Sequence, residues 1–255
     1  RKMLGIPEGK AIDFIRWSME CKGQRFELNL SYGEGKPNTL GFTADSGKQH
    51  ISGSYALAEH EQGQPFRKVY TFKPDGASGT FSFVLITADL MHVLDEAGQL
   101  MVGNGGWSYQ LNRRKPLRES ELFIRTSGAD TSSLRMVFDG RTPCREISAE
   151  HPEMNASSSC FKLKWRLILN RDPVTHRPTT FTMRKVVDNQ PRDITGVWAE
   201  ERKDGMLIYT VDADKPGAAI SFLVCDARIL LFLDKAKRPY LGNELFSYAM
   251  NRVKE

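Results

Sequence analysis

The stretch WSYQLNR at Trp107–Arg113 returns as FSYAMNR at Phe246–Arg252, a constant 139 residues later. Extended upstream without a gap to Tyr70 and Tyr209, the two segments agree at 15 of 44 positions. Unrelated sequences of average composition would agree at about three. The period exceeds the roughly 20–50 residues of a solenoid unit, and each copy is large enough to have its own core. The repeat therefore predicts two homologous domains in tandem.

The likeness continues upstream with small changes in length. Gly53–Tyr55 corresponds to Gly196–Trp198, and FELNLSY at Phe26–Tyr32 is aligned with FKLKWRL at Phe161–Leu167. The chain is therefore expected to divide into a first repeat, a linker and a second repeat, at residues 1–114, 115–135 and 136–255.

The segment between the repeats is polar and rich in turn-forming residues, which is typical of an exposed linker. Within it, ELFIR at 121–125 could pair as a short strand.

Apolar and polar residues alternate along both repeats. In FELNLSY the residues Phe26, Leu28 and Leu30 are separated by polar ones, and FKLKWRL has the same pattern. A period of two is typical of strands with one buried face. Further short β-rich runs follow between turn residues, and only residues 10–18 suggest a helical turn. We therefore expect an all-β protein with two small antiparallel meander barrels, because closure also removes exposed sheet edges.

Composition excludes several classes of protein. Hydrophobic residues make up 40% and charged residues 26% of the 255 residues, which indicates a globular chain rather than a disordered one. The longest apolar run, Ile229–Leu233, is far shorter than the roughly 18 residues of a membrane-spanning helix. The net charge of +5 is too small and too scattered to indicate nucleic-acid binding.

No catalytic motif is evident. The sequence contains no G-x-S-x-G, H-E-x-x-H or phosphate-binding G-x-x-x-x-G-K-[ST] pattern. The glycine-rich GNGGW at Gly103–Trp107 lies between two expected strands, and its counterpart GNELF has lost two of the glycines. A hairpin turn explains it better than a ligand loop. These observations favour a protein that is not an enzyme.

The order of motifs in the second repeat resembles the NlpE-type lipoprotein family. GVW at Gly196–Trp198 is followed by IYTV, ILLFLD and LGN-x-x-FSYAMNR, and VFDGRTPC at Val137–Cys144 precedes the first long strand. The resemblance spans about Val137–Arg252, and it covers Phe26–Arg113 more weakly. The C-x-x-C pair of that family is missing, because the next cysteine after Cys144 is Cys160.

The resemblance implies lipocalin-like barrels in a protein of the bacterial envelope, periplasmic or in the outer membrane. It implies a lipid anchor on a removed N-terminal segment, an envelope partner, and a binding or sensing role linked to copper or envelope stress. A second hypothesis is a carrier of a small apolar ligand inside a barrel. It needs an open cavity, whereas bulky residues predict filled interiors: Phe161, Trp165, Phe181, Phe222 and Phe232. A third is an enzyme with its site in a barrel mouth.

Cys144 and Cys160 are candidates for a disulfide. Disulfides persist outside the cytoplasm, where the resemblance places the protein. A bridge across this small, turn-rich loop would contribute about 3 kcal/mol of stability. Of the other two cysteines, Cys225 is expected to act as a small buried hydrophobe, and Cys21 has no evident partner.

A metal site is the alternative for the same loop, which also holds His151 and Met154. Thiolate, imidazole and thioether groups suit Cu(I), but their spacing matches no established metal motif. Free thiols are a third reading, and no cofactor is expected.

The Asn-Arg pair at the end of each repeat suggests a structural role. In lipocalin-like barrels a terminal arginine packs across an aromatic residue of the G-x-W strand and closes one end of the barrel. The resemblance therefore pairs Trp198 with Arg252 and Tyr55 with Arg113 as cation–π contacts.

Overall fold

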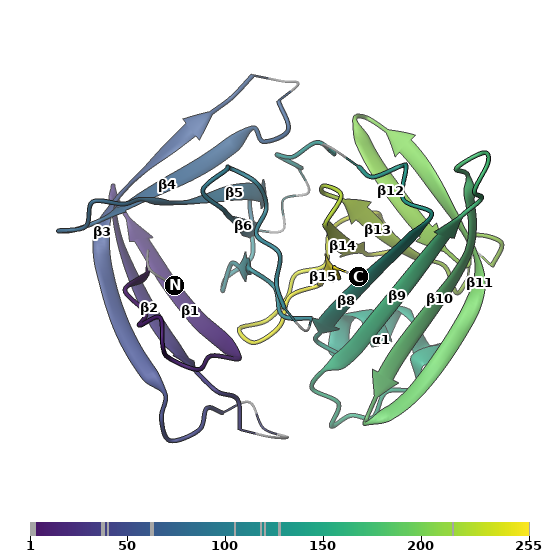
Figure 1. Ribbon diagram of the computed structural model, residues 1–255, viewed down its shortest axis with the longest axis horizontal. Coiled ribbons are helices and arrows are strands. Elements are labelled where there is room, and N and C mark those ends of the chain that lie inside the picture. Colours follow the sequence, from purple (N-terminus) through teal and green to yellow (C-terminus); the bar gives the residue numbers. More distant parts are fainter. Residues whose placement is uncertain are drawn as a thin grey trace.

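The computed structural model describes residues 4–36, 39, 41–61, 64–104, 106–117, 119, 121–126, 129–215 and 217–254. It confirms an all-β protein with two antiparallel sheets that lie side by side (Figure 1). The first sheet is a nearly closed barrel of strands in chain order: β1 (Phe14–Lys22), β2 (Arg25–Gly33), β3 (Gly47–Glu59), β4 (Lys68–Pro74), β5 (Phe81–Thr87), β6 (Leu90–Leu94) and β7 (Gln110–Asn112).

The second sheet is a closed barrel. Its strands are β8 (Arg135–Thr142), β9 (Leu163–Arg171), β10 (Pro178–Val187), β11 (Gln190–Lys203), β12 (Met206–Val211), β13 (Ile220–Val224), β14 (Ile229–Leu233) and β15 (Ala249–Arg252). Helix α1 (Arg145–Glu150) and the short 3-10 helix η2 (Pro152–Met154) connect β8 to β9. Ile147 of α1 and Met154 of η2 are buried in the core of this barrel.

Strand register identifies the equivalent strands of the two repeats. Phe26 of β2 lies opposite Gly53, and Phe181 of β10 lies opposite Gly196. A Cβ atom on Gly196 would approach the Phe181 ring to 2.9 Å, so the close passage of the ring requires glycine. Hence β2 corresponds to β10, and β1 corresponds to β9.

Two expectations about the start of the first repeat are therefore wrong. FKLKWRL lies before and in β9, so its counterpart is β1 (FIRWSMECK) rather than FELNLSY of β2. The same register makes Trp17 the equivalent of Trp165, because Cys21 faces Phe26 and Leu169 faces Phe181. The helical turn considered at 10–18 is also absent, since β1 begins at Phe14 and continues through that segment.

Strand β8 distinguishes the two sheets. It pairs with β9 on one side and with β15 on the other, which closes the second barrel. In the described part of the chain, no strand of the first repeat corresponds to β8. The first sheet therefore ends at β1 and β7, and its barrel stays open between these two edges.

The barrels share an apolar interface on the outer faces of β5, β6, β13 and β14, which lie at the centre of Figure 1. This one buried cluster contains residues at equivalent positions of the two repeats. The equivalent pairs are Val84 and Leu223, Ile86 and Cys225, and Leu90 and Ile229. The strands of this region are buried on both faces, which explains why Ile229–Leu233 is continuously apolar instead of alternating.

Contacts across the interface are reciprocal. The backbone N–H of Gly103 donates to Oδ1 of Asn251 (2.7 Å), and that of the equivalent Gly242 donates to Oδ1 of Asn112 (2.9 Å). Trp107 stacks on Phe246, its own equivalent, with ring centroids 5.7 Å apart. Such exchange of identical contacts is the property of a two-fold interface. Gly103 and Trp107, the first and last residues of GNGGW, therefore dock the first repeat against the second.

The linker packs between both barrels at its centre. Phe123 and Ile124 are buried, and Ile124 forms an isolated bridge with Phe66, so the short strand considered in ELFIR is reduced to one bridge. Thr126 donates from Oγ1 to the carbonyl of Val224 at 2.6 Å. The described residues near its two ends include exposed ones such as Lys115 and Ser132, whereas its apolar middle is part of the core.

Candidate functional site

A cleft of about 1370 Å³ lies on the open side of the first barrel. Strand β1, strand β7 and the inner residues of β3, β4 and β6 form its walls, and the 242–247 loop of the second barrel borders its mouth. Its volume exceeds the roughly 300–1,000 Å³ typical of small-molecule pockets. The cleft is therefore large enough for an extended ligand.

The cleft is lined by side chains whose equivalents form the core of the second barrel. Trp17 and Met19 of β1 are partly exposed, whereas the equivalent Trp165 and Leu167 are 3% and 0% exposed. The same contrast holds for Met91, Tyr109 and Leu111 in the cleft against the buried residues Leu230, Tyr248 and Met250. The cleft residues pack against a buried core of the first barrel, so the cleft is the part of this barrel's interior that stays uncovered.

Aromatic rings form the wall opposite the opening. Tyr55 lies against Phe72 with ring centroids 5.4 Å apart, and against Tyr70 at 5.8 Å. The Tyr55 hydroxyl donates to the carbonyl of Gly23 (2.8 Å), so its polar end is satisfied while its ring faces the cleft. This wall therefore presents aromatic surface to the cleft, which suits the apolar part of a ligand.

Basic side chains border the mouth. Arg141 of β8 lies over the Trp107 ring at 4.6 Å, and burial lowers its pKa against the weaker opposing effect of Asp13 and Asp139. Burial also lowers the pKa of Lys162, as do the neighbouring charges of Lys164 and Arg141. Arg16 of β1 lies over the rings of Phe14 and Phe42, at 5.6 and 5.3 Å. Each of these cations is only partly exposed, so a nearby anion would interact with them strongly.

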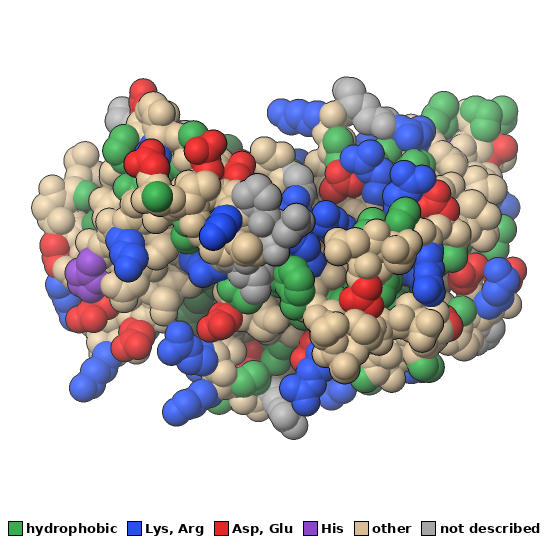
Figure 2. All heavy atoms as spheres, turned by 90° about the horizontal axis from the view of Figure 1, so that it is seen from below, with side chains coloured by type: hydrophobic (Ala, Val, Ile, Leu, Met, Phe, Trp, Pro, Cys, Tyr) green, Lys and Arg blue, Asp and Glu red, His purple; other side chains and the backbone are tan. Residues whose placement is uncertain are grey.

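On the face drawn in Figure 2, basic and acidic side chains are interspersed over both halves of the molecule.

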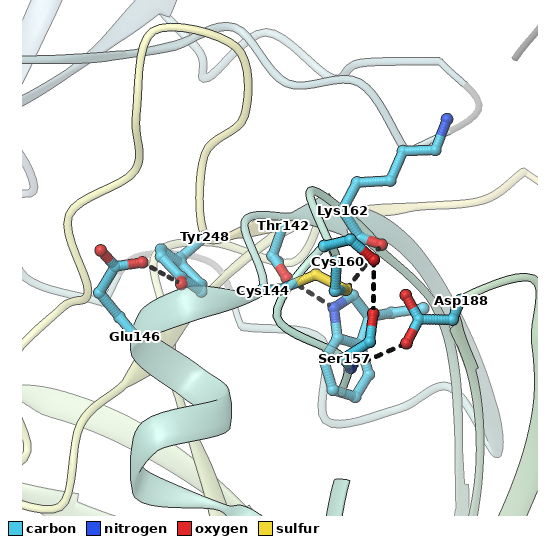
Figure 3. The surroundings of a disulfide bond; sticks show 10 residues. Thr142, Cys144, Glu146, Ser157, Cys160, Lys162, Asp188 and Tyr248 are labelled. Atoms are coloured by element: carbon cyan, nitrogen blue, oxygen red, sulfur yellow. Dashed lines mark hydrogen bonds between the residues drawn. A yellow bond between two sulfur atoms is a disulfide. The ribbon is translucent and has the colours of Figure 1, made fainter. Parts of the chain in front are cut away.

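The predicted disulfide between Cys144 and Cys160 is confirmed, with Cα atoms 5.9 Å apart. It joins the end of β8 to the segment before β9 (Figure 3). Side-chain contacts hold the region around it. The Ser157 N–H donates to Asp188 (2.9 Å), and the Tyr248 hydroxyl donates to Glu146 (2.9 Å). Burial, together with Glu146, raises the pKa of Tyr248.

The four candidate copper ligands have other roles. The sulfurs of Cys144 and Cys160 are joined to each other and supply no thiolate, and Met154 is buried among the core residues of the second barrel. His151 is buried, with its Nδ1 3.1 Å from Oε1 of Glu153. Among the residues that the structure describes, no three His, Cys, Asp or Glu side chains are grouped so as to hold a metal ion.

The remaining cysteines are free. Cys225 is fully buried in the interface between the barrels, as expected for a small hydrophobe, and Cys21 is exposed on β1.

The predicted pairing of Trp198 with Arg252 is wrong. The guanidinium over the Trp198 ring is that of Arg171, at 4.8 Å, and Arg171 also pairs with Glu200 at 2.7 Å. Arg171 is inside the barrel because it ends β9 with its side chain facing inward. Arg252 instead binds Asp130 of the linker at 2.7 Å.

Arg113 and Arg252 share a different structural role. Arg113 donates from Nε to the carbonyl of Ala88 (3.1 Å), and Arg252 donates from Nη1 to the equivalent carbonyl of Ala227 (3.3 Å). Each arginine thus holds the turn that joins two strands of its own sheet. Tyr55, the predicted partner of Arg113, contacts Gly23 and Phe72 in the cleft wall instead.

Four of the five predicted inward aromatic residues are buried in the core of the second barrel, namely Trp165, Phe181, Phe222 and Phe232. Phe161 is wrong, because it precedes β9 and is 46% exposed.

Sequence reasoning missed the cleft. The signal was present in FIRWSMECK, where Ile15, Trp17 and Met19 alternate with polar residues without a preceding strand like VFDGR. Residues 10–18, which include only the first half of this segment, suggest a helical turn instead, and this hides the absence of a closing strand.

No helix in the described part of the chain is both long and apolar enough to cross a membrane. Comparisons of the chain with protein-family models, curated proteins and solved structures find no match.

Proposed function

We propose that this chain is a non-enzymatic binding protein that takes an apolar or amphipathic ligand into the open first barrel. The observation that carries the proposal is the cleft of about 1370 Å³, lined by side chains whose equivalents are core residues in the second repeat. Leaving tryptophan, tyrosine and methionine side chains partly in water costs stability, which a bound apolar ligand would restore.

The proposed location is the bacterial envelope, as the NlpE-type resemblance implies, with a lipid anchor and a sensing role as further parts of the proposal. The Cys144–Cys160 disulfide supports an oxidising compartment, where such bonds persist. Thiolate copper binding is not part of the proposal, because both candidate thiols are joined in the disulfide.

The second barrel is assigned a structural role. Its interior is filled by large side chains such as Phe181 and Phe222, and it supports the first barrel through the shared apolar interface. The proposal therefore places the ligand in one repeat only.

Titration with the neutral dye Nile red tests the proposal. We expect the dye to bind the native protein with increased fluorescence, and Met91→Arg, which puts a charge into the cleft, to weaken binding by about tenfold or more. Val174→Arg is the matched control, since Val174 is 84% exposed and lies in the turn between β9 and β10. Equal binding by the native protein and Met91→Arg would contradict the proposal.

A further inference from the structure

The open side of the first barrel is bordered by the edges of two strands, β1 and β7. In the described residues, β1 is hydrogen-bonded to β2 alone, and β7 is hydrogen-bonded to β6 alone. Strand β1 runs over nine residues, from Phe14 to Lys22. A long edge presents a row of backbone N–H and C=O groups, which is a template for pairing with another strand.

The second repeat shows what closes such a gap. There β8 pairs with β9 over Arg135–Thr142 and with β15 near Gly140. It inserts the alternate side chains of Met136 and Phe138 into the core. The molecule therefore contains its own example of an extended strand in this position.

Register carries this example into the first repeat. Because β9 corresponds to β1, a strand placed like β8 would run antiparallel to Ile15–Lys22. In the second repeat Asp139 lies opposite Arg166, so the equivalent docked residue would lie opposite Ser18. Likewise Arg141 lies opposite Lys164, so its docked equivalent would lie opposite Arg16. Its alternate apolar side chains would cover Trp17 and Met19.

The basic side chains at the mouth of the cleft favour an acidic residue in the docked strand. Nε of Arg16 is buried and has no hydrogen-bond partner in the described residues. Arg141 and Lys162 also line this cleft as partly buried cations. An acidic residue at the docked position opposite Arg16 would therefore be favourable, whereas the arginine that β8 carries there would be repelled.

We propose that the cleft binds an extended segment of another polypeptide, which pairs with β1 and β7, buries apolar side chains at alternate positions and places an acidic residue beside Arg16. This is strand addition, in which backbone hydrogen bonds supply affinity and side-chain pockets supply specificity. The inference rests on the proposed function, because it names the class of molecule that the cleft takes.

Peptide binding to the full chain tests this inference. The probe is a fluorescent peptide with the sequence of Arg135–Thr142, and its control is a peptide of the same composition with the apolar residues made contiguous. We expect the probe to bind at least about tenfold more tightly than the control. The Arg141→Glu form of the probe should bind about fivefold more tightly than the original probe, as expected for one ion pair.

A cross-link tests the register without relying on a destabilising substitution. In a Cys21→Ser background, the chain receives Ser18→Cys or, as the matched control, Glu20→Cys on the same face of β1. With oxidised glutathione supplied as the oxidant, a probe with Asp139→Cys should form a mixed disulfide faster with Ser18→Cys, since these positions lie opposite each other in the proposed pairing. Amide exchange should also slow in β1 when the probe binds.

Each outcome is decisive. Probe binding with register-specific cross-linking and slower exchange in β1 supports the inference. If Nile red enters the cleft but the probe binds no better than its control, or cross-links equally at both positions, the inference fails and the proposed function stands. If neither the dye nor the probe binds, both proposals fail.

Discussion

Strands β1–β7 of the first repeat follow the same order as β9–β15 of the second, with inward-facing residues at equivalent positions, yet only the second repeat is a closed barrel. Trp165 and Trp17 are equivalent in register, but the first is buried and the second lines a cleft. The difference is one strand, β8, which supplies backbone partners to two edges and side chains to the core. Alternation along each strand determines which face is apolar, while the number of strands decides whether that face is covered.

The largest effect should come from the two equivalent tryptophans. Trp165→Ala removes a buried ring and the bond from its Nε1 to Thr142 (2.9 Å), so the free energy of unfolding should fall by about 3–5 kcal/mol. Trp17→Ala should cost only about 1–2 kcal/mol, because part of that ring is already in water. Urea denaturation measures both values. Equal losses would show that the two barrels are equally packed.

The second prediction concerns His92, whose equivalent in the other repeat is Leu231. Burial lowers the pKa of His92 to about 4 against a usual value of 6.5. At a pH between these two values, His92 is therefore protonated in the unfolded chain but not in the folded chain. The free energy of unfolding thus decreases as the pH falls from about 6.5 to 4. The loss should approach about 3 kcal/mol.

The variant His92→Leu places the residue of the second repeat at this position. It should make unfolding less dependent on pH in this window, although it removes the bond from Nε2 to the carbonyl of Met101 (2.8 Å). An unchanged slope of stability against pH would exclude His92 as the source.

The third prediction concerns the disulfide, which has no described counterpart in the first repeat. Replacing both cysteines by Cys144→Ser and Cys160→Ser should lower the free energy of unfolding by about 3 kcal/mol, because the unfolded loop is no longer constrained. Cys21→Ser, which removes an exposed free thiol, is the control and should leave stability unchanged. Dithiothreitol should destabilise the control, which keeps the bridge, and should not affect the double variant. The same effect on both would show that the bridge is not formed in solution.

The smallest effect should come from the reciprocal contacts at the interface. Asn251 is buried, accepts from Gly103 and donates to the carbonyl of Trp107 (2.8 Å), so Asn251→Ala should cost about 2 kcal/mol. Asn112→Ala should cost about 1 kcal/mol, since that side chain is only partly buried and its bond to Asn243 is longer, at 3.2 Å. Thermal unfolding of the two single variants gives the comparison. A larger loss for Asn112→Ala would reverse this assignment.

Sequence reasoning was accurate where the signal is local or repeated. The period of two in FKLKWRL predicted a strand, and the likeness of Trp107–Arg113 to Phe246–Arg252 predicted two related domains of all-β type. The pairing of Cys144 with Cys160 was also correct. It was wrong where similar patterns competed, since FELNLSY and FIRWSMECK both alternate and only cross-strand register shows which of them matches β9.

The sequence by itself determined the repeat, most of the strands and four of the five aromatic side chains expected to face inward, because these depend on residues that are neighbours along the chain. Three features were decided by the tertiary structure alone: the open side of the first barrel, the exchange of Asn112 and Asn251 across the interface, and the placement of Arg171 rather than Arg252 over Trp198. The physical reason is that sheet closure and interface contacts join residues far apart in the chain. Alternation along one strand shows which face is buried, but it does not show what buries it.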